Sequence, residues 1–175
     1  HEIVNTWTED RIADVLYKYG EEPRSRKLAR NIVASRPLET TGDLKSVLNQ
    51  CTHHKFQTKT LARCFQALRI VVNDEMAALE QALMETHNVV RPGGRLVVMS
   101  YHSLEDRIVK RRFQDWESEL GVPDELRHIF KDARKARGKR NPRKPIRPSM
   151  EEISENDASR SARLRVFVRG SDAAN

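Results

Sequence analysis

The chain has 175 residues, of which 38% are hydrophobic, 6% are aromatic and 33% are charged. This length suffices for one sizeable core, or for one domain with an insert, and no apolar run approaches the length that spans a membrane. Two cysteines exclude a disulfide framework and favour a reducing compartment, which is the cytoplasm of a bacterium or otherwise a mitochondrion or chloroplast. Because the chain begins at His1 rather than Met, directly before a helix signal, we expect a further segment upstream.

The net charge of +7 is concentrated in one segment. Residues 131–148 contain nine Lys or Arg and one Asp, and they are interrupted by one glycine and three prolines. We therefore expect a flexible segment that is extended or disordered until it meets a partner. The charge alone leaves two interpretations open, a solvated stretch without function or a surface that binds the phosphates of a nucleic acid.

Residues 1–58 contain three predicted short helices. Thr6-Trp7-Thr8-Glu9 has the form of a capping box and predicts a helix that stops at Gly20. A second helix is expected over about 24–35, before a proline that disfavours helical geometry in the preceding residue. A third is expected to follow a cap at position 40 or 41. These helices are too small to form a stable domain alone.

A longer pattern follows from about Thr60, where apolar residues recur every three or four positions as far as Leu83. This spacing predicts one continuous helix of about seven turns that joins the insert to a larger body. Pro92-Gly93-Gly94 then permits a tight reversal. The unbroken apolar run Leu96–Met99 is typical of a parallel strand that is covered on both faces. Ser103 is predicted to cap the next helix, which begins Ser103-Leu104-Glu105-Asp106.

Helix, turn, strand and helix in this order form a doubly wound α/β unit, in which ligands bind beyond the carboxyl ends of the strands. In this chain that place is Ser100–Ser103. A further capping box at Ser149–Glu152 predicts another helix. Residues 162–169 alternate between two faces, which predicts a last strand near the edge of the sheet.

Several motifs carry a resemblance to a known family. Arg91–Leu96 reads RPGGRL, and Ser100–Lys110 reads SYHSLEDRIVK. They are supported by YGEE from Tyr19, by FQALRI from Phe65 with the following Val72-Asn73, and by RSARLR from Arg160. In this order, and over most of the chain, the motifs closely resemble the ribosomal RNA small-subunit methyltransferase H family, also called MraW.

The resemblance implies an α/β fold, a partial class I (Rossmann-like) methyltransferase sheet with an all-α insert domain. It places the helical substrate-recognition insert at residues 1–58 and the C-terminal half of the methyltransferase domain at 59–175. It also implies methylation of cytosine N4 in small-subunit (16S-type) ribosomal RNA, with S-adenosylmethionine as the cofactor. The expected partner is this RNA or the small ribosomal subunit, with no membrane, and a homodimer is left open.

We expect no cofactor-binding residue in this chain. Folds of this kind hold the cofactor with a glycine-rich loop between a strand and a helix, whereas Gly93-Gly94 precedes a strand. The loop and its acidic partner are expected upstream, so this polypeptide alone is predicted to be inactive.

Cytosine N4 is a poor nucleophile because its lone pair is delocalised into the ring, so positioning should supply most of the acceleration. The candidate catalytic residues are Tyr101, His102 and Ser103: His102 would contact the base or relay its proton, and Tyr101 would support stacking. The alternative is that Ser103 only caps a helix and His102 only bonds to the backbone. The candidate substrate-binding residues are Arg63, Arg69, Asn73, Arg107, Lys110 and Arg111.

We predict no metal site, because Cys51, His53, His54 and Cys64 match no zinc-binding spacing. Three functions compete. The first is the RNA methyltransferase, and the second is a non-catalytic ribosomal-RNA-binding module derived from that family, which would grip RNA through residues 131–148. The third is a structural fragment that depends on a separate N-terminal half. Salt-sensitive RNA affinity without cofactor binding would identify the second, and methyl transfer restored by mixing the halves would identify the third.

Overall fold

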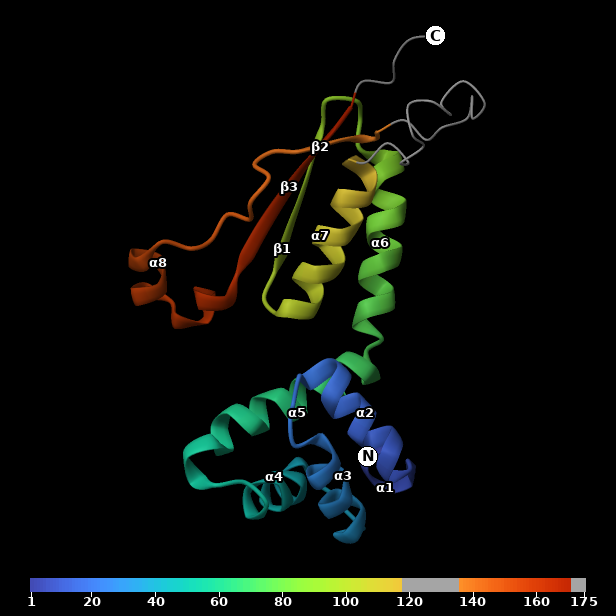
Figure 1. Ribbon diagram of the computed structural model, residues 1–175, viewed down its shortest axis with the longest axis vertical. Coiled ribbons are helices and arrows are strands. Elements are labelled where there is room, and N and C mark those ends of the chain that lie inside the picture. Colours follow the sequence, from blue (N-terminus) through green and yellow to red (C-terminus); the bar gives the residue numbers. More distant parts are fainter. Residues whose placement is uncertain (118–135, 171–175) are drawn as a thin grey trace, which may run out of the picture. The chain divides into compact units, whose positions relative to one another are not determined.

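The computed structural model describes residues 1–117 and 136–170, and it divides into two compact units, His1–Glu75 and Met76–Asn175 (Figure 1). Each unit has its own hydrophobic core. The boundary predicted after residue 58 lies inside the first unit, because the helix that follows it packs onto the helices before it. In the described part of the chain, no helix combines the length and the apolar character that crossing a membrane requires.

The first unit, which is described throughout, is entirely helical. Its elements are α1 (Glu2–Thr6), α2 (Glu9–Gly20), α3 (Ser25–Ala34), α4 (Thr41–Gln50), a 3₁₀ turn (His54–Phe56) and α5 (Gln57–Val72). The second and third predicted helices are confirmed as α3 and α4. Thr40 caps α4 in a capping box with Asp43, so the predicted cap is confirmed as well.

The first predicted helix begins later than its capping pattern indicated. Thr6 is the last residue of α1, and its hydroxyl donates a hydrogen bond to the Glu2 carbonyl oxygen at 2.9 Å. The true cap of α2 is Thr8, which accepts from the Arg11 amide at 3.4 Å. The prediction was wrong because two threonines stand two positions apart before the same apolar stripe, and the pattern does not choose between them.

The core of the first unit lies where α2, α3, α4 and α5 meet. Fully buried side chains include Ile12, Leu16, Leu28, Ile32, Leu48 and Cys64. Gly20 ends α2 as predicted, but it also has a packing role, because a Cβ at this position would lie 2.8 Å from the Arg63 carbonyl oxygen. The absence of a side chain at Gly20 therefore lets α2 and α5 approach closely.

The single long helix predicted from residue 60 is in fact two helices. α5 ends at Val72 with Asn73 as its C-cap, and α6 spans Glu75–Val89. Asp74 between them has a φ of 49°, which is left-handed backbone that a continuous right-handed helix does not contain. The apolar spacing continues across the break, so spacing alone predicted one helix. The break coincides with the division between the two units.

The second unit combines helices with a small antiparallel sheet. In the described residues the strand order is β1-β3-β2, with β1 at Arg95–Ser100, β2 at Gly138–Arg140 and β3 at Arg163–Arg169. The α/β class is thereby confirmed. β3 lies between β1 and β2 in this sheet, with only the three-residue β2 beyond it, so its place near the edge of the whole sheet stays a prediction. Alternation of side chains reports that two faces differ, but it does not report how many neighbours a strand has.

The prediction of β1 as a parallel strand covered on both faces is wrong for the described residues. Its partner β3 runs antiparallel, with Val97 opposite Val166 and Ser100 opposite Arg163. Val97 and Met99 are each 52% exposed, so one face of β1 is uncovered by the described chain. An apolar run indicates a preference for burial, but it does not indicate the direction of the neighbouring strand.

Helices α6 and α7 (Ser103–Glu117) lie on one side of the sheet (Figure 1). The core on this side is formed by Leu83, Val109, Phe113, Trp116 and Phe167. The rings of Phe113, Trp116 and Phe167 pack together with centroids 5.2 to 5.7 Å apart. The face of β3 that carries its arginines and Phe167 is therefore the face that packs on α7.

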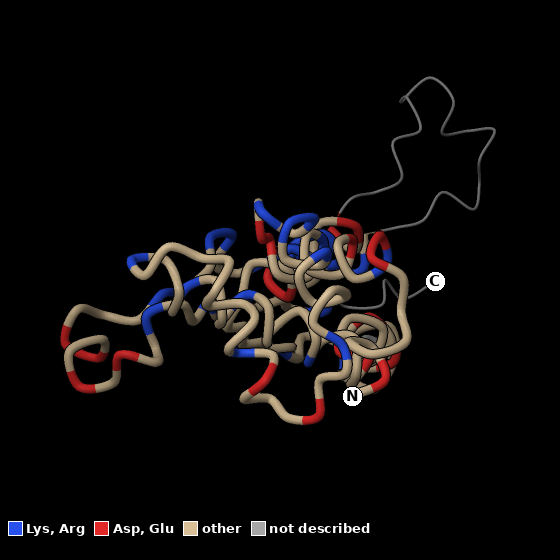
Figure 2. The backbone as a smooth tube through the Cα atoms, turned by 90° about the horizontal axis from the view of Figure 1, so that it is seen from below, with Lys and Arg blue, Asp and Glu red and all other residues tan. Residues whose placement is uncertain are grey.

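The described part of the basic segment, residues 136–148, is extended along β3. β2 pairs with β3, Ile146 forms an isolated bridge with Leu164, and Arg140 pairs with Glu117 at 2.5 Å. The extended conformation is confirmed here, while 131–135 lie outside the described residues. α8 (Met150–Glu155) follows, and its predicted cap is confirmed because Ser149 accepts from the Glu152 amide at 3.1 Å. Figure 2 marks the basic and acidic positions of the described chain.

Candidate functional site

The candidate catalytic residues form the turn between β1 and α7. β1 ends at the buried Ser100, whose hydroxyl donates to the Arg163 carbonyl oxygen at 3.3 Å. α7 begins at Ser103. The chain therefore brings Tyr101, His102 and Ser103 together at the carboxyl end of β1, which is where the sequence placed them.

His102, and not Ser103, caps α7. Its Nδ1 accepts from the Glu105 amide at 3.4 Å, while the Glu105 carboxylate accepts from the amides of Tyr101 at 2.9 Å and His102 at 3.3 Å. This bonding assigns the imidazole proton to Nε2, because Nδ1 acts as an acceptor. Nε2 lies 3.4 Å from Glu105 Oε1 but makes no hydrogen bond within the described residues. The buried ring thus holds one N–H donor that no described residue satisfies and that is itself buried.

Tyr101 is 57% exposed and borders a hollow of about 220 Å³. Other residues that line this hollow include Met99 and Leu164 from the sheet and Ile146 and Arg147 from the extended segment. An exposed ring above apolar side chains, with a cation beside it, is an arrangement that suits a base and its phosphate. The hollow lies on the face of the sheet opposite α7.

Asp106 connects the start of α7 to β3. Its carboxylate accepts two hydrogen bonds from Arg165, at 2.7 and 3.0 Å, and one from Arg163 at 2.7 Å. Burial raises the pKa of Asp106, but its hydrogen bonds and charge interactions with the two arginines outweigh burial and hold the pKa below its ordinary value. Sequence reasoning did not single out Asp106. The available signal was two arginines on the same strand face as Phe167.

The cations predicted on α7 share one exposed face. Arg107, Lys110 and Arg111 are all exposed, and their spacing of three and four residues places them on the same side of the helix. Three positive charges therefore follow the Tyr101–Ser103 turn along α7.

The remaining candidates, Arg63, Arg69 and Asn73, belong to the first unit. Arg63 pairs with the buried Glu22 at 3.5 Å, so it fastens α5 to the connection after α2. Arg69 donates to both oxygens of Glu75 at 2.8 and 3.1 Å, and the Asn73 side chain donates to the same carboxylate at 3.1 Å. The expectation that Arg69 and Asn73 project from one helix face is thereby confirmed, and their role toward RNA stays a prediction.

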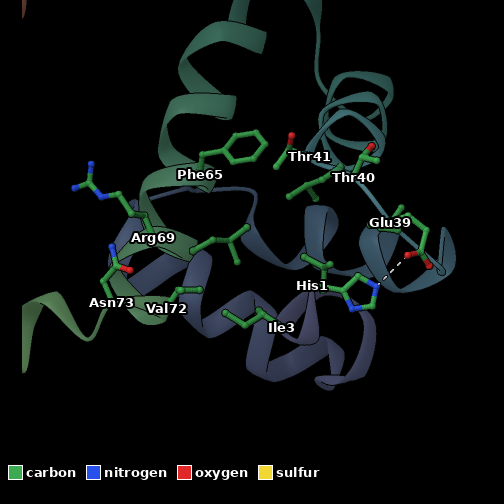
Figure 3. Close-up of a pocket in the computed structure, with 13 residues that line it drawn as sticks. His1, Ile3, Glu39, Thr40, Thr41, Phe65, Arg69, Val72 and Asn73 are labelled. Carbon is green, nitrogen blue, oxygen red and sulfur yellow. Dashed lines mark ion pairs between the residues drawn. The ribbon is translucent and has the colours of Figure 1, made fainter.

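Arg69 and Asn73 also border a hollow of about 330 Å³ with a largely apolar lining (Figure 3). Figure 3 shows them on one side of it, near Phe65, while an ion pair between His1 and Glu39 lies on the other side. The hollow is formed by the first unit alone. Its polar groups are at the margin, so its interior offers contacts for an apolar or aromatic group and no charged group.

The glycine pair does not form a cofactor cradle. Gly93, with a φ of 76°, and Gly94 connect α6 to β1, and the Gly93 amide donates to the Arg169 carbonyl oxygen at 2.9 Å. A nucleotide-like cofactor is instead held at a turn that leads from a strand into a helix. None of the described residues forms such a glycine-rich turn.

The two cysteines have structural surroundings. The Cys51 thiol donates to the Val47 carbonyl oxygen at 2.8 Å. Cys64 is fully buried, and burial raises the pKa of its thiol to about 12. Because the thiolate is the form that binds metals and attacks electrophiles, Cys64 is suited to packing rather than to chemistry.

The chain belongs to a family of methylases: residues 1–170 match the model of the MraW methylase family. Curated relatives carry the name ribosomal RNA small subunit methyltransferase H. The protein from Coprothermobacter proteolyticus is 43% identical over 173 residues, which cover 97% of this chain and 52% of that protein. The protein from Rhizorhabdus wittichii is 46% identical over 174 residues, covering 96% and 53%. The chain thus spans about half the length of these relatives.

Proposed function

We propose that this chain forms the substrate side of an S-adenosylmethionine-dependent methyltransferase that acts on cytosine N4 of small-subunit ribosomal RNA. The observation that carries the proposal is the turn after β1, where exposed Tyr101, the Nε2–H donor of His102 and the cations of α7 follow one another. The names of the relatives supply the substrate class.

The sheet supports a partial class I (Rossmann-like) architecture. Doubly wound folds often carry an antiparallel strand at the edge of an otherwise parallel sheet. The order β1-β3-β2 fits such an edge, and β1 offers the rest of the sheet an edge that pairs with no described strand. The uncovered Val97 fits a place where further elements pack. The carboxyl end of β1 then becomes the ligand-binding side of the sheet.

S-adenosylmethionine, when bound, supplies the methyl group as a sulfonium, and we assign none of the described residues to holding it. This chain's contribution is positioning of the base. Tyr101 offers a face for stacking, and Arg107, Lys110 and Arg111 attract the RNA backbone. Holding a weak nucleophile in the reactive geometry is the contribution expected to count most for an exocyclic amine.

We assign His102 to contact with the base rather than to proton removal. Its Nδ1 is occupied by the Glu105 amide, and its Nε2 carries a proton, so the capped ring has no free acceptor. Nε2 is itself buried, so a base reaches it only after the side chains that cover it move; its N–H then donates to O2 or N3 of a cytosine and fixes the orientation of the base. The proton that leaves N4 passes to water or to a group outside the described residues.

The test uses the whole protein that contains this chain. His102→Asn preserves the cap, because asparagine is a preferred N-cap residue, but it removes the Nε2–H donor. We expect the rate of methyl transfer to unmethylated small subunits to fall by about a hundredfold, as for other losses of positioning. Glu151→Ala on the exposed face of α8 is the control and should leave the rate unchanged. A wild-type rate in the His102→Asn variant would show that His102 only caps α7 and does not contact the base.

A second candidate is the non-catalytic ribosomal-RNA-binding module. It is favoured by the exposed cations of the extended segment, Lys139, Arg143, Lys144 and Arg147, together with the lack of a glycine-rich cradle in the described residues. Calorimetric titration of the whole protein that contains this chain, with S-adenosylmethionine and with RNA, separates the candidates. RNA binding by a whole protein that never transfers a methyl group would favour the module.

A further inference from the structure

The first unit carries a second basic surface, on which the sequence analysis placed no site residue. A hollow of about 620 Å³ lies between the end of α2 and the start of α3. Its lining includes Asp14, Tyr17, Pro23, Arg24, Arg26 and Lys27. Tyr17 is 68% exposed, so the faces of its ring are available for stacking.

The cations at this hollow are in excess over its carboxylates. Arg26 and Lys27 are exposed, and neither forms an ion pair with any described residue. The buried Glu22 carboxylate accepts from the Arg24 amide at 3.1 Å at the start of α3, but it lies beneath the exposed cations and is shared with Arg63. Asp14 is the only acidic side chain in the lining, and three cations outnumber it.

Exposed rings continue from the hollow onto the 3₁₀ turn. The Arg24 guanidinium lies 5.7 Å from the centroid of the Phe56 ring, which is 46% exposed. Next to Phe56, the rings of His53 and His54 have centroids 4.2 Å apart. The end of α2 and the start of α3 thus build one aromatic–basic surface with the 3₁₀ turn, which lies more than 25 residues later in the sequence. This surface is defined by Tyr17, Arg24, Arg26, Lys27, His53, His54 and Phe56.

We propose that the aromatic–basic surface binds a single-stranded segment of RNA. Bases stack on Tyr17 and Phe56, and the phosphates between them contact Arg26 and Lys27, the combination by which proteins hold unpaired strands. An acidic peptide would use the cations alone, whereas the exposed rings beside the cations favour bases. The identity of the ligand as RNA rests on the proposed function, and the surface adds a second place where the substrate is gripped.

The experiment measures the affinity of the 175-residue chain for a fluorescent single-stranded oligonucleotide of small-subunit ribosomal RNA, without cofactor. Tyr17→Ala should weaken binding about fivefold to a hundredfold, the range of base stacking on an aromatic side chain. Lys27→Glu should weaken binding and lower the slope of log K against log salt by about 0.7 or more, because at least one phosphate contact is lost. Lys45→Glu, the same change on exposed α4, and Met150→Ala should each stay within about twofold of wild type.

The outcomes separate this proposal from the proposed function. If Tyr17→Ala, Lys27→Glu and the wild type bind RNA with equal affinity, the proposal for the aromatic–basic surface is overturned and the proposed function is unaffected. Weakening by Lys27→Glu but not by Tyr17→Ala would show attraction of the phosphates without stacking of a base on Tyr17, and this result would also overturn the proposal. If the wild-type chain does not bind the RNA at all, both proposals fail together.

Discussion

At the scale of single residues, Asp106 is a buried carboxylate that two arginines share. It is 4% exposed and accepts hydrogen bonds from Arg163 and from Arg165, which is also buried. Asp106→Asn leaves two guanidinium groups without their carboxylate, so we expect a loss of about 3–5 kcal/mol in the free energy of unfolding. Urea denaturation checks this. Asp157→Asn, which breaks an exposed pair with Arg160, should cost at most about 1 kcal/mol. Similar losses in the two variants would show that the bonds from Arg163 and Arg165 to Asp106 stabilise the protein no more than an exposed ion pair does.

The same residue gives the chain a defined pH response. The pKa of Asp106 is lower in the folded protein than its ordinary value, so folding favours the ionised form. Its contribution is fully present above the unfolded-state pKa of about 3.9, and it is lost as pH falls through the folded-state pKa. The stability difference between wild type and Asp106→Asn should therefore be constant near neutral pH and shrink below about pH 4. A difference that grows on acidification would refute this sign.

At the scale of elements, the contact of α2 with α5 depends on Gly20. Alanine favours a helix over glycine by about 1 kcal/mol, but its Cβ would lie 2.8 Å from the Arg63 carbonyl oxygen. Because that oxygen belongs to the backbone, the helices must separate, and we expect Gly20→Ala to destabilise the protein by about 1–3 kcal/mol. Gly42→Ala on exposed α4 meets only the Thr40 hydroxyl at 3.3 Å and should change stability by less than about 1 kcal/mol. Thermal unfolding of both variants provides the comparison, and a stabilised Gly20→Ala would be the contrary result.

The boundaries of the helices and strands were predictable where local capping signals fix them, and not where they depend on distant parts of the chain. α3 and α4 were predictable because a proline and a capping box fix their ends locally. The division of α5 from α6 was not, because it depends on the backbone of Asp74 while the apolar spacing runs on unchanged. The direction of β1 likewise depends on β3, which lies more than sixty residues later in the sequence.

At the scale of the whole molecule, the site was predictable where the chain itself brings residues together. Tyr101–Ser103 directly follow one strand. The rule that ligands bind beyond the carboxyl ends of strands therefore located these residues without knowledge of any contact. The hydrogen-bonded ion pair between Asp106 and Arg165 was not predictable, because it depends on the register of β1 with β3 and on the packing of α7 on both strands. The aromatic–basic surface was missed for the same reason, since Tyr17, Lys27 and Phe56 meet only through the fold of the first unit.

The uneven charge of the chain makes a last prediction at this scale. If the net charge of +7 acts as a diffuse field, neutralising any two exposed cations should weaken RNA binding equally. If the extended segment contacts phosphates, Arg143→Gln/Lys144→Gln should lower the slope of log K against log salt by about 1.4, or 0.7 for each contact. Lys45→Gln/Lys59→Gln removes the same charge from exposed positions of the first unit and should leave the slope unchanged. Contact with phosphates depends on where the positive charge lies, whereas a diffuse field does not. Equal slopes for the two double variants would therefore show that the basic segment is only a solvated stretch.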